Sequence, residues 1–261
     1  MKTKFKFLAQ VLFSFIFLFT SKLVFASSSE MIHLENNRLI ASSHPFQNPD
    51  LYRDTQKLEK PDVFDSLHLG KLGLARRAYD YAMLGFNKMK SNGLISNDQI
   101  LSIIDFTLAS AKKRLFVIDV KNYKLLFVTH VAHGRNTGLE KALYFSNEPE
   151  SNKSSVGFYT TKATYSGAHG YSMRLEGHEI GFNNNAEPRA IVVHSADYVN
   201  EDMAKTQGRL GRSLGCPALS PKINKDIIDK IKNGTCLFIY GHDSEYIMNS
   251  KYLKQPVRRG R

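Results

Sequence analysis

Short runs of β-branched and aromatic residues recur in this 261-residue chain from Ile100 to Tyr240, and turn-forming residues separate them. Such runs are typical of β-strands, because branched and aromatic side chains pack well on a pleated surface. A mostly β domain with a few helices is therefore predicted. The expected strands cover residues 100–106, 115–120, 123–128, 156–160, 171–175, 191–194 and 236–240.

Two segments have the pattern of helices. From Leu72 to Met89 the apolar positions fall three or four residues apart, and Gly93 follows as a stop signal. Near the end of the chain, Ser220 is a suitable N-cap for a second helix that would end at Gly234. The predicted fold class is mainly β (α+β), with a helical segment ahead of the sheet.

The N-terminus has the three parts of a secretory signal peptide. Lys2, Lys4 and Lys6 precede an apolar run over residues 8–19, and Ala26 ends a stretch with small residues at the cleavage positions. A membrane anchor is the alternative, but the apolar run is shorter than the roughly 20 residues that span a bilayer. We therefore expect cleavage after Ala26, export to the periplasm or cell envelope, and no stable membrane span after signal removal.

The rest of the chain is divided by its patterns into four further segments. These are a loosely ordered lead-in (27–68), a helical segment (69–96), the mostly β domain (97–246) and a basic C-terminal tail (247–261). The formal net charge is +12, and removal of the signal, which carries four lysines and no acidic residue, leaves +8. For an exported protein this charge favours anionic envelope polymers or lipid headgroups over nucleic acid as partners.

The residues with the clearest chemistry are His194 and Cys216. His194 ends an apolar strand, and Cys216 follows 22 residues later in a glycine-rich turn near Arg209 and Arg212. A thiol must become a thiolate to attack a carbonyl, and nearby positive charge and an imidazole are expected to lower its pKa. Gly215 would allow a carbonyl oxygen to approach backbone N–H groups, as an oxyanion hole requires.

Two other interpretations of the same residues remain open. Secreted proteins often pair their cysteines, so Cys216 could form a disulfide with Cys236, although Cys236 lies in an apolar strand where a thiol acts as a small core residue. His130 and His133 also suggest zinc, but on a strand two residues three apart face opposite sides.

The segment from His194 to Ala218 resembles the active-site signature of the L,D-transpeptidases with a YkuD-like catalytic domain. His194, Ser213, Gly215 and Cys216 match that signature, and the run Gly211-Arg212-Ser213-Leu214-Gly215-Cys216-Pro217-Ala218 resembles the murein L,D-transpeptidase branch. The similarity extends over residues 72–245 and includes the segments 104–114, 131–134, 145–147, 154–159 and 165–181. It implies an L,D-transpeptidase-like β-sandwich and weakens the disulfide interpretation.

The resemblance implies a cysteine acyltransferase of the cell wall without a metal or organic cofactor. Cys216 would attack the third residue of a peptidoglycan tetrapeptide stem, His194 would move the proton, and an amine would resolve the thioester. Beside these two residues we expect two sets of supporting residues. Gly215, Ser195 and Ser213 would form the oxyanion hole or orient the catalytic groups, and Arg212, Arg209, His133 and Tyr165 would bind substrate.

One residue departs from the family pattern. Most of the wider family has a histidine two positions before the cysteine, where this chain has Leu214. Leu214 keeps open a non-catalytic peptidoglycan-binding domain as an alternative. An L,D-carboxypeptidase that uses water at the same site is a second alternative, because pocket shape and water exclusion choose the acceptor. The expected partners are peptidoglycan stem peptides, and the sequence leaves the acceptor and the oligomeric state undetermined.

Overall fold

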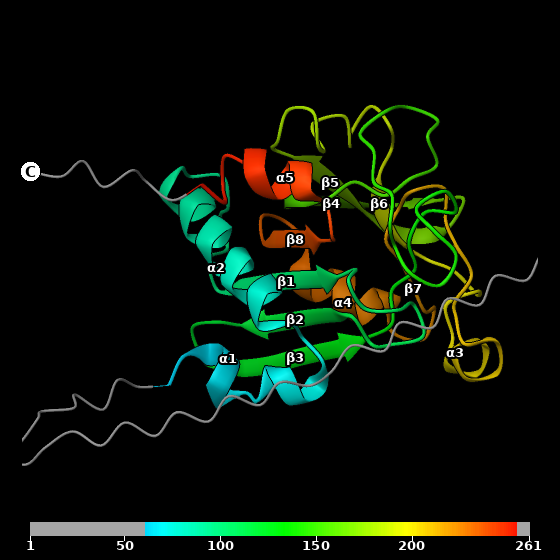
Figure 1. The fold of residues 1–261 in the computed structure, drawn as a ribbon, viewed down its shortest axis with the longest axis horizontal. Coiled ribbons are helices and arrows are strands. Elements are labelled where there is room, and N and C mark those ends of the chain that lie inside the picture. The colour runs from blue at the N-terminus through cyan, green and yellow to red at the C-terminus, as the bar shows by residue number, and fades with distance from the viewer. Residues whose placement is uncertain (1–60, 255–261) are drawn as a thin grey trace, which may run out of the picture. The chain divides into compact units, whose positions relative to one another are not determined.

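The computed structural model describes residues 61–254, which form a sheet-rich fold with few helices (Figure 1). The predicted signal peptide, all but the end of the predicted lead-in, and the last seven residues lie outside the described residues. No helix among residues 61–254 is long and apolar enough to cross a membrane. The predicted fold class is confirmed.

Eight strands form the sheet, in the order β3-β2-β1-β8-β4-β5-β6-β7. Every predicted strand is present, and β7 was not predicted. The strands are β1 (Ile100–Asp105), β2 (Leu115–Asp119), β3 (Lys124–Thr129), β4 (Gly157–Gly167), β5 (Gly170–Gly177), β6 (Val192–Ser195), β7 (Ala218–Leu219) and β8 (Cys236–Tyr240). The β1–β8 and β6–β7 pairs are parallel, and the other pairs are antiparallel.

The central strands are buried on both faces, and their side chains alternate between two cores. In β1, Leu101 and Ile103 pack in the core that includes α2 (Arg76–Ser91) and α5 (Ser244–Asn249). Ile100 and Ile104 pack in a second core with α4 (Asn224–Ile231). Helices on both faces therefore explain why these strands are buried at every position rather than at every second position.

The helices begin later than the sequence patterns predicted. The apolar spacing from Leu72 continues into α2, but η2 (Leu69–Leu72) is a separate 3-10 helix, because Gly73 adopts a φ of 100° and interrupts the α-helical path. Ser220 does not cap α4. Its carbonyl accepts the N–H groups of Ile223 and Asn224, so a turn over residues 221–223 precedes the helix.

Two further helices complete the described fold. α1 (Val63–Ser66) is capped by the Asp62 carboxylate and falls within the segment predicted as a lead-in. α3 (Glu201–Gln207) occupies the polar stretch between β6 and β7 and is capped by the Asn200 side chain. It leads the chain from His194 toward the turn that carries Cys216.

The start of the predicted C-terminal tail packs on the core. Tyr252 is 1% exposed, although it lies beyond residue 246. The buried Glu179 side chain accepts hydrogen bonds from the Phe158 N–H, the Tyr246 hydroxyl and the Ser250 hydroxyl. These bonds connect the segment after β8 to the body of the sheet.

Candidate functional site

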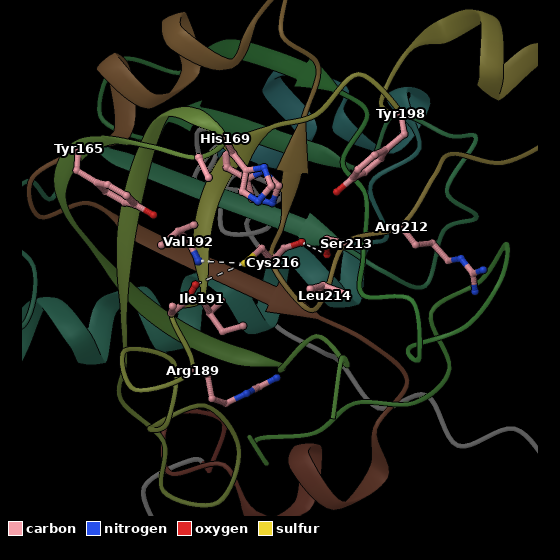
Figure 2. A pocket seen from close by; sticks show the side chains of 13 residues that line it. Tyr165, His169, Arg189, Ile191, Val192, Tyr198, Arg212, Ser213, Leu214 and Cys216 are labelled. Atoms are coloured by element: carbon pink, nitrogen blue, oxygen red, sulfur yellow. Dashed lines mark hydrogen bonds between the residues drawn. The ribbon is translucent and has the colours of Figure 1, made fainter. Parts of the chain in front are cut away.

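A cavity of about 450 Å³ opens beside the end of β6 (Figure 2). It is bounded by the β4–β5 turn, by the segment leading into β6 and by the glycine-rich turn before β7. Its lining residues are Tyr165, Ala168, His169, Arg189, Ala190, Ile191, Val192, His194, Tyr198, Arg212, Ser213, Leu214 and Cys216.

Strand pairing brings Cys216 and His194 to this cavity. β6 runs parallel to the short strand β7, and His194 lies opposite Ala218, two residues after Cys216. The sequence separation of 22 residues between thiol and imidazole is thus closed by one pair of neighbouring strands. The structure brings together the two residues that the sequence singled out.

The His194 ring is held in one orientation. Its Nδ1 lies 2.9 Å from the Ser195 carbonyl oxygen, and because a carbonyl only accepts, Nδ1 carries the proton. In the neutral ring Nε2 is then the basic nitrogen. The ring stacks on His169, with 4.4 Å between centroids. Burial lowers the pKa of His194 below 6.5, the hydrogen bond to Ser195 opposes this effect, and the charge of His169 adds to it.

The Cys216 thiol lies between two backbone groups of the segment before His194. Its Sγ is 3.6 Å from the Ala190 carbonyl oxygen and 3.5 Å from the Val192 nitrogen. Burial raises the pKa of the thiol, so the expectation of a lowered pKa was wrong in direction. The Val192 N–H and the positive charge of Arg189 counteract burial without outweighing it. At neutral pH the thiol is therefore protonated, and it shares the cavity with the neutral His194 imidazole.

Arg189 is the charged residue that the sequence interpretation missed. Its guanidinium donates to the carbonyl oxygens of Ser146 (2.9 Å) and Lys153 (2.7 Å), and also to the hydroxyls of Ser151 and Ser155. It thereby connects the loop 146–155 to the cavity wall. The sequence contained one signal for Arg189. It lies five residues before His194, just ahead of the strand that carries this candidate base.

Ser213 and Gly215 shape the turn that presents the thiol. The Gly215 N–H donates to the Ser213 hydroxyl at 3.1 Å, and this hydroxyl donates to the Cys216 carbonyl oxygen at 2.6 Å. Gly215 adopts a φ of 132°. A Cβ on Gly134 would lie 2.9 Å from the Gly215 Cα, so these backbones pack directly together. The Gly215 N–H, expected in the oxyanion hole, already has an acceptor.

Of the predicted substrate-binding residues, Arg212 and Tyr165 line the cavity. Arg212 also donates from Nη1 to the carbonyl oxygens of Arg135 (2.9 Å) and Gly138 (3.2 Å), which supports a structural contribution. Its guanidinium lies at the rim, away from the thiol (Figure 2). Leu214 is 63% exposed at the same rim, where most of the wider family has a histidine.

The structure does not bring His133 and Arg209 to the cavity. His133 is fully buried, its Nδ1 accepts from Arg114 at 2.7 Å and its Nε2 donates to the Gly138 carbonyl oxygen. Burial and then the charge of Arg114 lower the pKa of His133 to about 3. This neutral histidine is part of the interior. Arg209 donates to the Leu210 carbonyl oxygen.

The disulfide and zinc interpretations find no structural counterpart among the described residues. Cys216 and Cys236 are both free, and Cys236 is buried in β8 with its Sγ 3.6 Å from the Met89 sulfur. Within residues 61–254, no group of three or more His, Cys, Asp or Glu side chains is arranged to hold a metal ion. His130 instead hydrogen bonds to the Ala111 carbonyl oxygen.

Solved structures similar to this chain include several L,D-transpeptidases. An L,D-transpeptidase from Mycobacterium smegmatis shares 16% identity over 55% of this chain and 59% of its own, with a TM-score of 0.33. L,D-transpeptidase 3 from Mycobacterium tuberculosis shares 14% over 55% and 61%, with a TM-score of 0.34. A variant of the helical cell shape determining protein Pgp2 from Campylobacter jejuni shares 11% over 66% and 58%, with a TM-score of 0.39. The chain thus spans about three fifths of these proteins.

No curated protein sequence matches the chain significantly. The family described as the L,D-transpeptidase catalytic domain matches residues 71–240, which is more than half of the chain and includes both His194 and Cys216. The chain therefore belongs to the L,D-transpeptidase catalytic domain family.

Proposed function

We propose that this protein is an exported peptidoglycan L,D-transpeptidase with Cys216 as its nucleophile. The observation that carries the proposal is the shared cavity of Cys216 and His194, with His194 Nδ1 held by the Ser195 carbonyl at 2.9 Å. A nucleophile, a base and a group that orients the base are the parts that covalent acyl transfer needs. The substrate class follows from membership of the family.

In the first half-reaction the Cys216 sulfur attacks the carbonyl of the third residue of a tetrapeptide stem, and its proton passes to His194 Nε2. The thiol pKa is raised by burial and the imidazole is neutral, so proton transfer accompanies the attack. The carbon–nitrogen bond to the terminal D-Ala then breaks, and His194 returns the proton to the departing amine.

Backbone dipoles and one cation support the charge that develops. The Val192 N–H and Arg189 stabilise negative charge at sulfur, as their effects on the thiol pKa indicate. The Cys216 N–H holds the oxyanion, since the Gly215 N–H is engaged with Ser213. In the second half-reaction an amine attacks the thioester carbonyl, the carbon–sulfur bond breaks and the sulfur recovers its proton through His194.

Mass spectrometry of the purified protein with disaccharide-tetrapeptide tests this function. The expected products are free D-Ala, a thioester on Cys216 and a cross-linked dimer. Cys216→Ala should give none of them, and Cys236→Ala should give all three. Release of tripeptide without dimer would establish an L,D-carboxypeptidase instead, and binding without any product would establish a peptidoglycan-binding domain.

A further inference from the structure

A second cavity, of about 480 Å³, adjoins the cavity that contains the thiol. It is lined by Ala168, His169, Gly170, Ser195, Ala196, Asp197 and Tyr198. Three of these residues, Ala168, His169 and Tyr198, line the first cavity as well. These shared residues lie at the boundary between the two cavities, here called the partition, and Figure 2 shows the His169 and Tyr198 side chains at the edge of the thiol cavity.

The partition follows from the geometry of β6. Successive side chains of a strand point to opposite sides, so His194 lines the cavity with the thiol and Ser195 lines its neighbour. The Ser195 hydroxyl donates to the His169 carbonyl oxygen at 3.0 Å, which fixes the partition to the strand. His194 contacts the partition directly through its stacking on His169. The candidate base is therefore adjacent to both cavities.

The two cavities differ in charge. The thiol cavity is lined by Arg189 and Arg212 and by no acidic residue, whereas the second cavity is lined by Asp197 and by no lysine or arginine. The Asp197 side chain is exposed, and no cation among residues 61–254 forms an ion pair with it. The first cavity thus suits an anionic ligand and the second a cationic one.

We propose that the second cavity binds the acyl acceptor and that Asp197 recognises its primary ammonium group. This inference rests on the proposed function, in which the donor stem occupies the cavity with the thiol. The bound ammonium releases one proton to solvent, and its nitrogen attacks the thioester carbonyl past His169. The carbon–sulfur bond breaks, and the second proton lost by nitrogen passes through His194 to the Cys216 sulfur. An amide and a free thiol result.

The test separates the two half-reactions with disaccharide-tetrapeptide, which serves as donor and acceptor. Asp197→Asn should form the Cys216 thioester at the wild-type rate in intact-protein mass spectrometry. Its ratio of cross-linked dimer to hydrolysed tripeptide should fall about fivefold, which corresponds to the loss of one exposed charge pair. Asp197→Lys should lower the ratio further, because it repels the ammonium.

A matched control and a salt series distinguish recognition from a general structural effect. Asp202→Asn, an exposed acidic residue on α3 that lines neither cavity, should keep the wild-type ratio. Added salt should lower the ratio in the wild type and leave it constant in Asp197→Asn, because salt screens only the charge pair.

Three outcomes would overturn the inference, and they differ from one another. An unchanged ratio in both Asp197 variants, with the thioester still formed, refutes the acceptor site alone. Loss of thioester formation in Asp197→Asn places Asp197 in the donor half-reaction. No thioester in the wild-type protein refutes the proposed function and the acceptor site with it.

Discussion

Cys216 and Cys236 have the same side chain but lie in two regions whose surroundings give the thiol different accessibility. Cys236 lies on β8, fully buried among apolar neighbours, and burial strongly raises its pKa. Burial also raises the pKa of Cys216, but there the Val192 N–H and Arg189 oppose the effect, and the thiol opens on a cavity beside His194. Burial therefore raises the thiol pKa of both cysteines. Cys216 differs because its thiol opens on a cavity that His194 also lines.

The largest expected effect comes from removing the sulfur at the cavity. Cys216→Ala should abolish release of D-Ala from disaccharide-tetrapeptide, because the other cysteine of the chain, Cys236, is buried in β8 and lines no part of the cavity. The melting temperature should hardly change, since the turn is held by backbone and Ser213 contacts rather than by the thiol. If the Cys216→Ala variant released D-Ala near the wild-type rate, Cys216 would have no catalytic role that distinguishes it from Cys236.

Loss of the base should come next. His194→Ala should lower kcat/KM for D-Ala release by a factor of about 10² to 10⁴, the usual range for a general base. His169→Ala, which removes the stacked ring and leaves His194 in place, serves as the control and should retain more activity. Equal losses in the two variants would contradict the assignment of the base to His194.

The pH profile of the wild-type protein sharpens the same assignment. Because burial lowers the pKa of His194, its neutral and basic form persists below pH 6.5. The kcat/KM should therefore stay near its maximum as the pH falls through 6.5, and it should decline only when the pH passes below the lowered pKa. A decline centred above pH 6.5 in the kinetic profile would indicate a different base or a different direction of the shift.

A smaller effect should follow from removing the cation near the sulfur. Arg189→Gln should slow alkylation of Cys216 by iodoacetamide several-fold at pH 8, because loss of the positive charge raises the thiol pKa further and leaves less thiolate. Arg212→Gln is the matched control at the rim and should leave the alkylation rate unchanged. If the Arg212 variant slowed alkylation more than the Arg189 variant, the assignment of the thiol's cation would be reversed.

The smallest effect should come from the other cysteine. Cys236→Ala should keep the wild-type rate of D-Ala release and lower the free energy of unfolding by about 1 kcal/mol, through lost packing against Met89. Iodoacetamide should modify native wild-type protein at Cys216 and reach Cys236 only after denaturation. Modification of native protein at Cys236 would show that the reagent reaches this thiol in the folded state and that β8 does not bury it.

The predicted strands were found because their signal is local. The run Leu115–Asp119 is branched and aromatic at most positions, and such a segment forms a strand wherever it pairs. The two-residue strand β7 has no such pattern, because it exists only through its pairing with β6 and with Ala132. The start of α4 was missed for a similar reason, since Ser220 has the chemistry of a cap but caps nothing.

The residues of the candidate site also fall into two groups, those found from local sequence and those found only from the tertiary structure. The sequence by itself singled out the candidate nucleophile and the candidate base, since a cysteine in a glycine-rich turn and a histidine at a strand end carry their chemistry in their local context. Only the tertiary structure placed His133 in the interior beside Arg114 and brought Arg189 to the thiol. It also decided the direction of the thiol pKa. These properties depend on distances and burial among segments far apart in the chain, and a pattern of neighbouring residues contains neither.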